Sequence, residues 1–252
     1  TPGLQIDGGP LQARARGGIS FHNDHHSPHL DIAADIGDTP IALAHGFWIH
    51  HLMPKATVAW LDAALRGGTL RQVHAVVAGD LADWPFRNEP GMAGAGVFRA
   101  EAHIDNGTVK FQPDWPAAEH MDAALSFIAD GFTVDGRAQL AGVGVSTLKA
   151  GIQRFSASEL TVDAVTAGDA SRYLALLSAS PLHAKYGEVM DNLRAEGKAN
   201  ATFAMVLPLG HEQPHAAKVD GSVVLDGARL REQRWSLDFQ QVRGQASYDQ
   251  DG

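Results

Sequence analysis

Histidine is the residue type of this sequence best suited to chemistry. Four histidines fall within eight residues: His22, His25, His26 and His29. A second group of three lies at positions 45–51. Imidazole binds zinc, but a built zinc site needs three or four ligands in tetrahedral geometry and outer hydrogen bonds that orient them. The first group lies in a turn-rich loop, and short histidine-rich tracts bind metal weakly through composition alone. We therefore predict no metal site and interpret His22 and its neighbours as an adventitious cluster.

The remaining candidates for catalysis do not fit a catalytic geometry. The segment GVGVS at 142–146 is not followed by the second glycine that a nucleophile elbow needs, and it lies in a strand-like run. Asp80 and Asp83 lie at a turn, where solvated carboxylates are common. The chain has no cysteine, so it has no thiolate nucleophile and no thiolate zinc ligand. We predict that the chain is not an enzyme and uses no cofactor.

Composition narrows the possible partners. The chain has 252 residues, 44% of them hydrophobic, and a net charge of −9. This acidic balance argues against nucleic acid, which selects a clustered basic face, and against electrostatic docking on an anionic membrane. The uncharged stretch Thr39–Pro54 is shorter than the about 20 apolar residues of a membrane helix. Because no initiating methionine or signal peptide is visible, we expect a piece cut from a longer protein.

Alternation of apolar and polar residues is the main structural signal. Phe98, Ala100, Ala102 and Ile104, for example, alternate with charged or polar neighbours. Similar runs recur from the first hairpin at 4–15 to the last strand near 235–248. A period of two with one polar face is what half-buried antiparallel strands require. We predict a mainly β fold built on a long, twisted antiparallel sheet with one apolar face.

Three short helices interrupt these strands at the edges of the sheet. The first spans 54–66, opens at a proline and ends at Gly67-Gly68. The second follows Asp169, a natural N-cap. The third spans 181–195 and closes at Gly197. They suggest sub-segments 1–53, 54–167 and 168–252 within one extended unit that covers residues 1–252.

Two Trp-Pro dipeptides, Trp84-Pro85 and Trp115-Pro116, punctuate the first half of the chain. An indole can stack on a sugar ring. Such a pair more often anchors a sheet corner, because proline blocks further strand pairing. We interpret both as corner anchors.

Several unrelated pieces of sequence, taken in order, carry a resemblance to a known family. They are WLDAALRGGTL (60–70), GDLADWPF (79–86), NGTVKFQPDWPAAEHMDAALSF (106–127), SASPL (178–182), KVDGSVVLDGARL (218–230) and WSLDFQQVRGQASY (235–248). In this order they resemble the YhdP family of AsmA-like envelope proteins. The resemblance runs from about Ile41 to the end of the chain, and the first 40 residues fit by strand pattern alone.

The resemblance implies a large periplasmic protein of a Gram-negative bacterium. An N-terminal helix outside this piece would anchor it in the inner membrane, and membrane contact would occur only through parts absent here. It also implies a curled sheet of the repeating β-groove type, whose apolar groove carries phospholipid between the two membranes. The partners would then be phospholipid, or another acyl-chain ligand, and neighbouring segments of the same chain.

If such a groove exists, alternation predicts which side chains line it. The predicted lining is Phe98, Ala100, Ile104, Phe111, Phe127, Phe132, Val134, Leu160, Val162, Phe203, Met205, Val223, Leu237 and Phe239. Periodicity shows that a side chain is buried, but it does not show whether a ligand or the protein itself covers that side chain. The same residues could equally face a closed core, as in a structural or polysaccharide-binding envelope domain. Alternation alone leaves both interpretations open.

Overall fold

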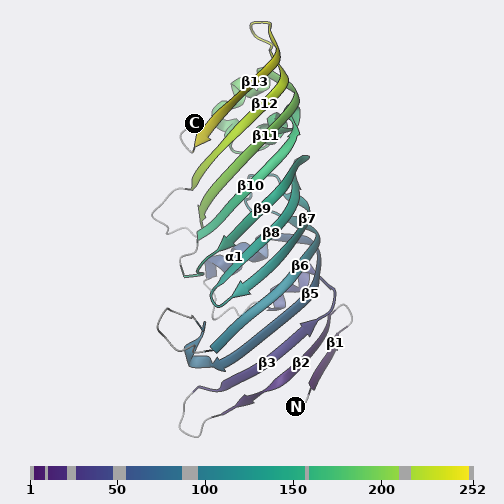
Figure 1. Cartoon of the computed structure of the whole chain (residues 1–252), viewed down its shortest axis with the longest axis vertical. Helices are drawn as coiled ribbons and strands as arrows, with labels where there is room; N and C mark the ends of the chain where they lie inside the picture. The colour runs from purple at the N-terminus through teal and green to yellow at the C-terminus, as the bar shows by residue number, and fades with distance from the viewer. Residues whose placement is uncertain are drawn as a thin grey trace.

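The structure, a computed structural model, describes residues 3–8, 11–21, 27–47, 55–86, 96–156, 159–209 and 217–249. Within these residues a single antiparallel sheet of 13 strands dominates (Figure 1). The strands lie in the sheet in chain order from β1 to β13, except that the short β4 pairs beside β5, off the main path. Each strand therefore reaches the next through a hairpin or a short excursion, as antiparallel pairing allows.

The bounds of the elements follow the chain. The strands are β1 (Gly3–Gly8), β2 (Leu11–Ser20), β3 (His29–Ile36), β4 (Thr39–Pro40), β5 (Leu65–Asp80), β6 (Gly96–Val109), β7 (Ala118–Ile128), β8 (Gly131–Leu140), β9 (Val143–Ile152), β10 (Glu159–Asp169), β11 (Leu193–Pro208), β12 (Lys218–Glu232) and β13 (Leu237–Asp249). The helices are η1 (Ile41–Phe47), α1 (Lys55–Ala64), η2 (Leu81–Asp83), α2 (Ala170–Ser178) and α3 (Leu182–Asn192). The mainly β fold with three short α-helices is thus confirmed.

Two glycine positions correct the helix ends expected from the sequence. Gly67-Gly68 does not cap α1, which ends at Ala64, and Gly197 does not cap α3, which ends at Asn192. Both lie inside the strands that follow, where the pairing register shifts. Gly68 and Gly197 have φ angles of 111° and 103°, which side chains rarely tolerate. Each strand begins directly at the end of its helix, so both glycines lie inside the strand. There they are bulge residues of β5 and β11.

The start of α2 follows the prediction. Asp169 is the N-cap, and its carboxylate accepts hydrogen bonds from Ser171 N at 2.9 Å and from Ser171 Oγ at 2.6 Å. The amide of Gly197 donates to the other oxygen at 2.9 Å. These bonds lower the pKa of the Asp169 carboxyl, chiefly through the Ser171 side chain. One side chain thus caps α2 and fixes the bulge of β11.

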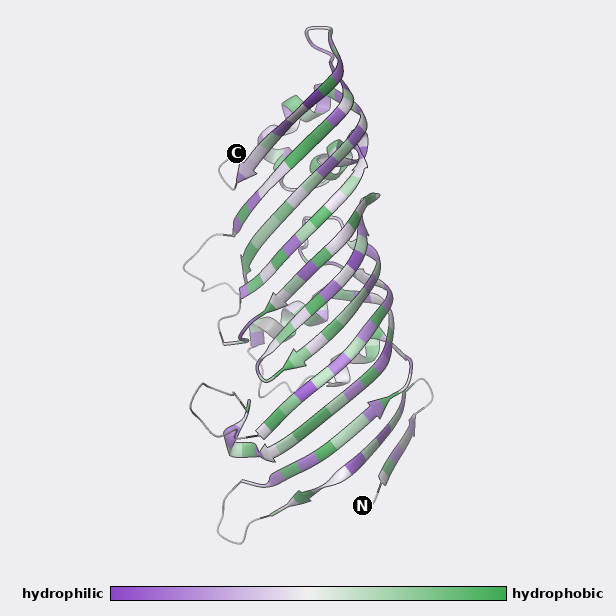
Figure 2. Cartoon of the chain, in the orientation of Figure 1, coloured by the Kyte–Doolittle hydropathy of each residue, from purple (hydrophilic) through white to green (hydrophobic). Residues whose placement is uncertain are grey.

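The two faces of the sheet differ in polarity. Apolar and polar bands alternate along each strand (Figure 2). Residues of one face pack with the helices: Ile41 of η1 joins a buried cluster on β5–β9, and Trp60 of α1 packs against a second on β8–β11. Tyr173 and Leu174 of α2 pack against a third on β11 and β12. The helices therefore lie over the apolar face. None of the helices in the described part of the chain is long and apolar enough to cross a membrane.

Bulges gather toward one end of the strands. Register shifts interrupt the pairing near Gly68, Asn106, His120, Gly197 and Gly227, whereas the opposite halves of the same strands pair without interruption. The bulged end is the end at which the chain leaves β10 for α2 and returns from α3 into β11. Bulges bend a strand and increase its twist. One long side of the sheet therefore has more curvature built into it than the other.

Candidate functional site

Cross-strand pairing aligns the inward side chains in rows that run across the strands. The first central row holds Ala102, Leu125, Val134, Ala150, Val162, Met205 and Val219. The second central row holds Ile104, Ala123, Gly136, Leu148, Ala164, Phe203 and Gly221. Each row crosses seven consecutive strands, β6 to β12, without a charged or hydrogen-bonding side chain. We call these two rows together the central strip.

Two further rows flank the central strip on β8–β11. The near margin holds Phe132, Ile152, Leu160 and Leu207. The far margin, on the bulged side, holds Ala138, Val145, Thr166 and Ala201. The near-margin side chains are only 5%, 1%, 2% and 8% exposed, and the three apolar residues of the far margin are also buried. Every residue of the central strip on the same four strands is only half-buried.

This order of burial is the reverse of that in a closed sandwich. Two packed sheets bury the middle of their inner faces most deeply and leave the strand ends more exposed. On β8–β11 the middle of the apolar face is more exposed than its two margins. The described chain therefore covers the margins and leaves the central strip on β8–β11 partly open to solvent. On β6 and β7, Ile104 and Ala123 of the same strip are buried in the cluster that Ile41 joins.

An aromatic wall covers the near margin. Phe132 stacks between Phe127 and Phe155, with ring centroids 5.4 and 6.2 Å apart and interplanar angles of 26° and 27°. Trp60 packs against the same cluster from α1. The Trp60 indole Nε1–H donates to the backbone oxygen of Phe111 at 2.9 Å. Because that donor is satisfied, the ring can lie against apolar surface at no polar cost.

Helix α2 covers the far margin on β10 and β11, whereas Ala138 and Val145 of the same margin belong to the buried cluster that Ile41 of η1 joins. The Thr166 hydroxyl donates to the oxygen of Ala201 at 3.1 Å, so its single hydrogen is committed. The Tyr173 hydroxyl, 2.8 Å from Thr166 Oγ1, therefore acts as the donor in that pair. Burial raises the pKa of the Tyr173 phenol above its ordinary value. Tyr173 thus ties α2 to the sheet through a self-satisfied polar pair.

Apolar side chains continue to both edges of the sheet. On β13, Phe239 pairs with Leu230, which packs against the cluster under α2, and Leu237 lies two residues away on the same face. Phe239 and Leu237 are 53% and 41% exposed, and Leu4 on β1 is also exposed. Apolar surface beside the strip therefore reaches both edges of the described sheet, while the second central row itself ends at the half-buried Tyr248, which pairs with Gly221.

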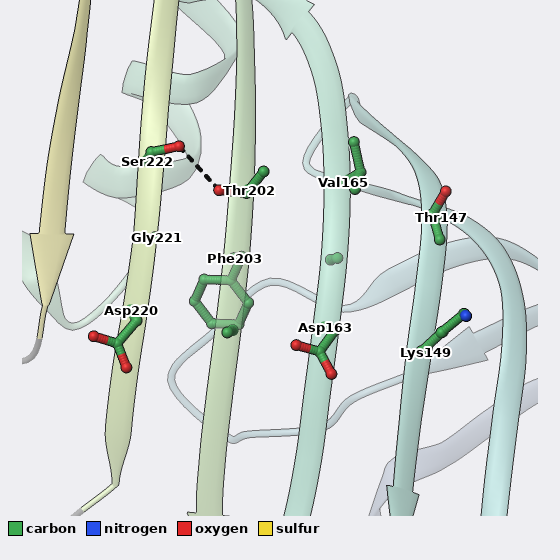
Figure 3. Close-up of a pocket in the computed structure, with 11 residues that line it drawn as sticks. Thr147, Lys149, Asp163, Val165, Thr202, Phe203, Asp220, Gly221 and Ser222 are labelled. Atoms are coloured by element: carbon green, nitrogen blue, oxygen red, sulfur yellow. Dashed lines mark hydrogen bonds between the residues drawn. The ribbon is translucent and has the colours of Figure 1, made fainter.

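The opposite face carries the charged side chains. Cross-strand ion pairs such as Asp35–His74 at 2.6 Å and Asp122–Arg137 at 3.0 Å cover it. A shallow hollow of about 450 Å³ lies on this face over β9–β12 (Figure 3). Its outward lining includes Thr147, Lys149, Asp163, Val165, Thr202, Ala204, Asp220 and Ser222. Phe203 lies behind the sheet in this view, on the apolar face. Because hydrocarbon avoids such a charged lining, the central strip and not the hollow is the candidate site for an apolar ligand.

Comparison with known proteins decides the family. The sequence profile of the family described as "YhdP protein" matches residues 2–252, nearly the whole chain. The chain belongs to the YhdP family.

One curated relative of this YhdP-family chain is the "Intermembrane phospholipid transporter YhdP" of Escherichia coli strain K12. The two are 30% identical over an alignment of 220 residues, and the match covers 83% of this chain. The chain spans only 17% of the length of that relative. No solved structure matches the chain.

The YhdP-family chain places most of the predicted lining on the apolar face. Val134, Val162, Met205, Ile104 and Phe203 are members of the central strip. The other predicted residues lie beside the strip on the same face: Phe98, Ala100, Phe127, Phe132, Leu160, Val223, Leu237 and Phe239. Phe111 departs from the prediction, because β6 ends at Val109. Its ring lies beside Trp115, with centroids 6.2 Å apart.

Sequence reasoning missed several residues of the site. Ala150 and Leu148 of β9 were not assigned to any face. Their alternation with Lys149 and Gly151 could have found them. Trp60 was recognised only as part of a helix, and no local pattern could place its ring over strands 70 to 150 residues later in the chain.

The predicted histidine cluster lies mostly outside the described residues. His22, His25 and His26 are among those not described. His29 begins β3, and its Nδ1 lies 2.9 Å from a carboxylate oxygen of Asp80. Among the described residues, no group of three or more histidine or carboxylate side chains is placed to hold a metal ion.

Proposed function

We propose that this chain is one section of a bridge that moves phospholipid between the inner and outer membranes, and that the central strip is the floor of the groove in which the acyl chains lie. The supporting observation is the order of burial on β8–β11, where the floor is more exposed than the walls. The E. coli relative, named an intermembrane phospholipid transporter, supports the class of ligand. In this proposal residues 1–252 form one extended unit of a longer protein in the periplasm.

The chemistry of the floor suits a ligand that slides. An acyl chain gains about 0.8 kcal/mol for each CH₂ that leaves water. Such affinity comes from contact area and not from named polar groups, so a chain can shift along the floor without breaking hydrogen bonds. Neither central row offers a charge or a hydrogen-bonding side chain from β6 to β12. The function needs no catalytic group, and we infer that the section acts without catalysis.

The ends of the sheet also suit a conduit. Because Leu4 at one edge and Phe239 at the other remain exposed, neighbouring segments of the same protein could extend the apolar face in both directions. A lipid-binding domain that acts alone would instead be expected to close at least one end. We therefore place this section between two others and assign direct membrane contact to the rest of the protein.

Native mass spectrometry of the purified section tests the proposal. The expected result is co-purifying diacyl phospholipid that detergent removes and added phospholipid restores. A section that carries bound sugar, or that binds no phospholipid when the lipid is offered in excess, would contradict it. Those outcomes would support a polysaccharide-binding or purely structural role.

A further inference from the structure

Trp60 of α1 shares the near-margin cluster with the first central row. Its ring packs against the buried near-margin cluster, and Val134, Val162 and Met205 of the first central row pack against the same cluster. The cluster beneath the ring is buried, but Trp60 itself is only half-buried. Part of the Trp60 side chain therefore remains uncovered next to a cluster that the first central row also contacts.

Hydrogen bonds and burial fix the position of this ring. The indole N–H is held by the oxygen of Phe111, and the amide of Lys110 donates to the oxygen of Ala64 at 2.7 Å. Both bonds tie α1 to the segment that follows β6. Val58, Leu61 and Ala64 on the inner side of α1 are buried, so rolling the helix would expose them. The wall that carries Trp60 is therefore rigid.

The opposite wall is fixed in a similar way. Tyr173 of α2 donates its hydroxyl to Thr166 on the far margin, so this ring is also tied to the sheet. On β8–β11 the two central rows lie between the near and far margins of the sheet. Two aromatic walls, each held by a hydrogen bond, give the strip over β8–β11 a set width.

We propose that Trp60 is an acyl-chain contact of this groove and that its ring sets the groove width over β8–β11, an inference that rests on the function proposed above. An indole face is large, rigid and apolar once its N–H is satisfied elsewhere. A straight acyl chain on the first central row lies against that face. A chain with methyl branches is wider and collides with the ring, so Trp60 selects unbranched chains.

Fluorescence quenching by brominated lipid tests the contact. The section is loaded with phosphatidylcholine that carries bromine atoms midway along its acyl chains, and tryptophan emission is compared with that of the section loaded with unbrominated lipid. Wild type should be quenched, and Trp60→Phe should lose the larger part of that quenching. Trp235→Phe is the matched control, because Trp235 is 72% exposed on the β12–β13 turn and should leave the quenching unchanged. Equal quenching of wild type and Trp60→Phe would overturn the proposal.

Crosslinking to the unaltered protein gives a second measurement that needs no folded variant. A phospholipid with a diazirine in its acyl chain is irradiated in complex with wild type, and trypsin then releases residues 56–66, which contain Trp60, as one peptide. Adducts are expected on that peptide. Adducts on strand peptides without any on 56–66 would refute the Trp60 contact but leave the groove standing, whereas failure of lipid to bind at all would refute the function itself.

The composition of the lipid that the section retains tests whether Trp60 sets the width of the groove. When straight-chain and methyl-branched phospholipids compete, wild type should retain mainly the straight-chain lipid. Trp60→Ala should shift the retained mixture toward the branched lipid, and Trp60→Phe should restore part of the selectivity. A Trp60→Ala section that binds lipid with unchanged selectivity would show that the ring does not set the width.

Discussion

A glutamate placed in the central strip separates an open groove from a closed core. Val162 lies in the first central row between Ala150 and Met205 and is half-buried. Val165 lies on the same strand but on the opposite face, where it is exposed. Ile152 lies in the near margin and is fully buried. The changes Val162→Glu, Val165→Glu and Ile152→Glu thus place one side chain in three environments.

The expected stability losses differ because water reaches the three positions differently. Full burial of a valine side chain is worth about 1.5–3 kcal/mol, so a half-buried Val162 loses about 1 kcal/mol while water still solvates its new carboxylate. For a domain of this size about 1 kcal/mol lowers the melting temperature by about 2–4 °C. An unpaired charge at Ile152 costs about 3–5 kcal/mol, a large part of a total stability of about 5–15 kcal/mol. Val165→Glu should change stability by less than about 0.5 kcal/mol.

The three variants should rank differently in the amount of phospholipid they retain than in stability. A carboxylate in contact with hydrocarbon costs several kcal/mol, and each 1.4 kcal/mol is a factor of about ten in affinity. Val162→Glu should therefore retain at most about one tenth of the phospholipid held by wild type, while Val165→Glu retains it all. Thermal melts by circular dichroism and lipid counts by native mass spectrometry, made on the same preparations, measure both effects. Val134→Asp, with its exposed neighbour changed in Thr133→Asp, repeats the test on β8.

Two results would refute this reasoning. If Val162→Glu unfolds the section as Ile152→Glu does, the middle of the apolar face is a closed core. If Val162→Glu folds and retains phospholipid as wild type does, Val162 does not face the acyl chains.

Three further predictions concern the walls and an edge of the sheet. The bonds from Ser171 lower the pKa of the Asp169 carboxyl in the folded protein. The ionised carboxylate therefore stabilises the fold above the unfolded-state pKa of about 3.9, and this stabilisation is lost as the pH falls through the lower folded-state pKa. Asp169→Ala should cost about 1 kcal/mol at pH 7 and should reduce the fall of the melting temperature toward acid pH. Burial raises the pKa of the Tyr173 and Tyr248 phenols in the folded protein. The neutral phenols therefore stabilise the fold fully below the unfolded-state pKa of about 10, and this stabilisation is lost as the pH rises through the higher folded-state pKa values. Replacing both residues by phenylalanine should reduce the fall of the melting temperature toward alkaline pH, and an unchanged fall would contradict this. A Cβ atom on Gly221 would collide with the Tyr248 side chain and with the backbone oxygen of Thr202. Gly221→Ala should therefore speed amide hydrogen exchange in the paired parts of β11 and β13 before that in other strands, and unchanged exchange in both strands would contradict this.

Much of the fold could be predicted from the sequence because each strand carries its own signal. Alternation in a run such as 98–104 fixes both the strand and its apolar face without knowledge of its neighbours. Pairing in chain order then requires only the turns between runs. Gly67-Gly68 and Gly197 misled the prediction because glycine with positive φ serves a helix C-cap and a strand bulge equally well. The choice depends on whether the next residues pair in a sheet, which is not local information.

The openness of the site could not be predicted for a related reason. Val162 and Leu160 are two apolar residues of one strand on one face, but Leu160 is buried and Val162 is half-buried. The difference comes from Trp60, Phe155 and Leu209, which pack over the near margin from other parts of the chain. Alternation assigns a residue to a face, and only the three-dimensional arrangement of the walls decides how much of that face stays open.

The position of the bulges along the strands decides which part of the apolar face keeps its pairing register. A one-residue slip in pairing would move every apolar side chain beyond it to the wrong face. Between β6 and β12 the shifts fall on the far side of the central rows, so both rows keep their register over these strands. The same bulges lie on the side of the sheet where α2 attaches. Uninterrupted pairing keeps the central rows aligned, and the bulges bend the sheet beside them. The length of such a strip grows with the number of strands, at about 4.8 Å for each, while its width depends on the position of the bulges along them. A protein built this way can lengthen the strip by adding strands without altering its cross-section, which is the geometry that a conduit between two membranes requires.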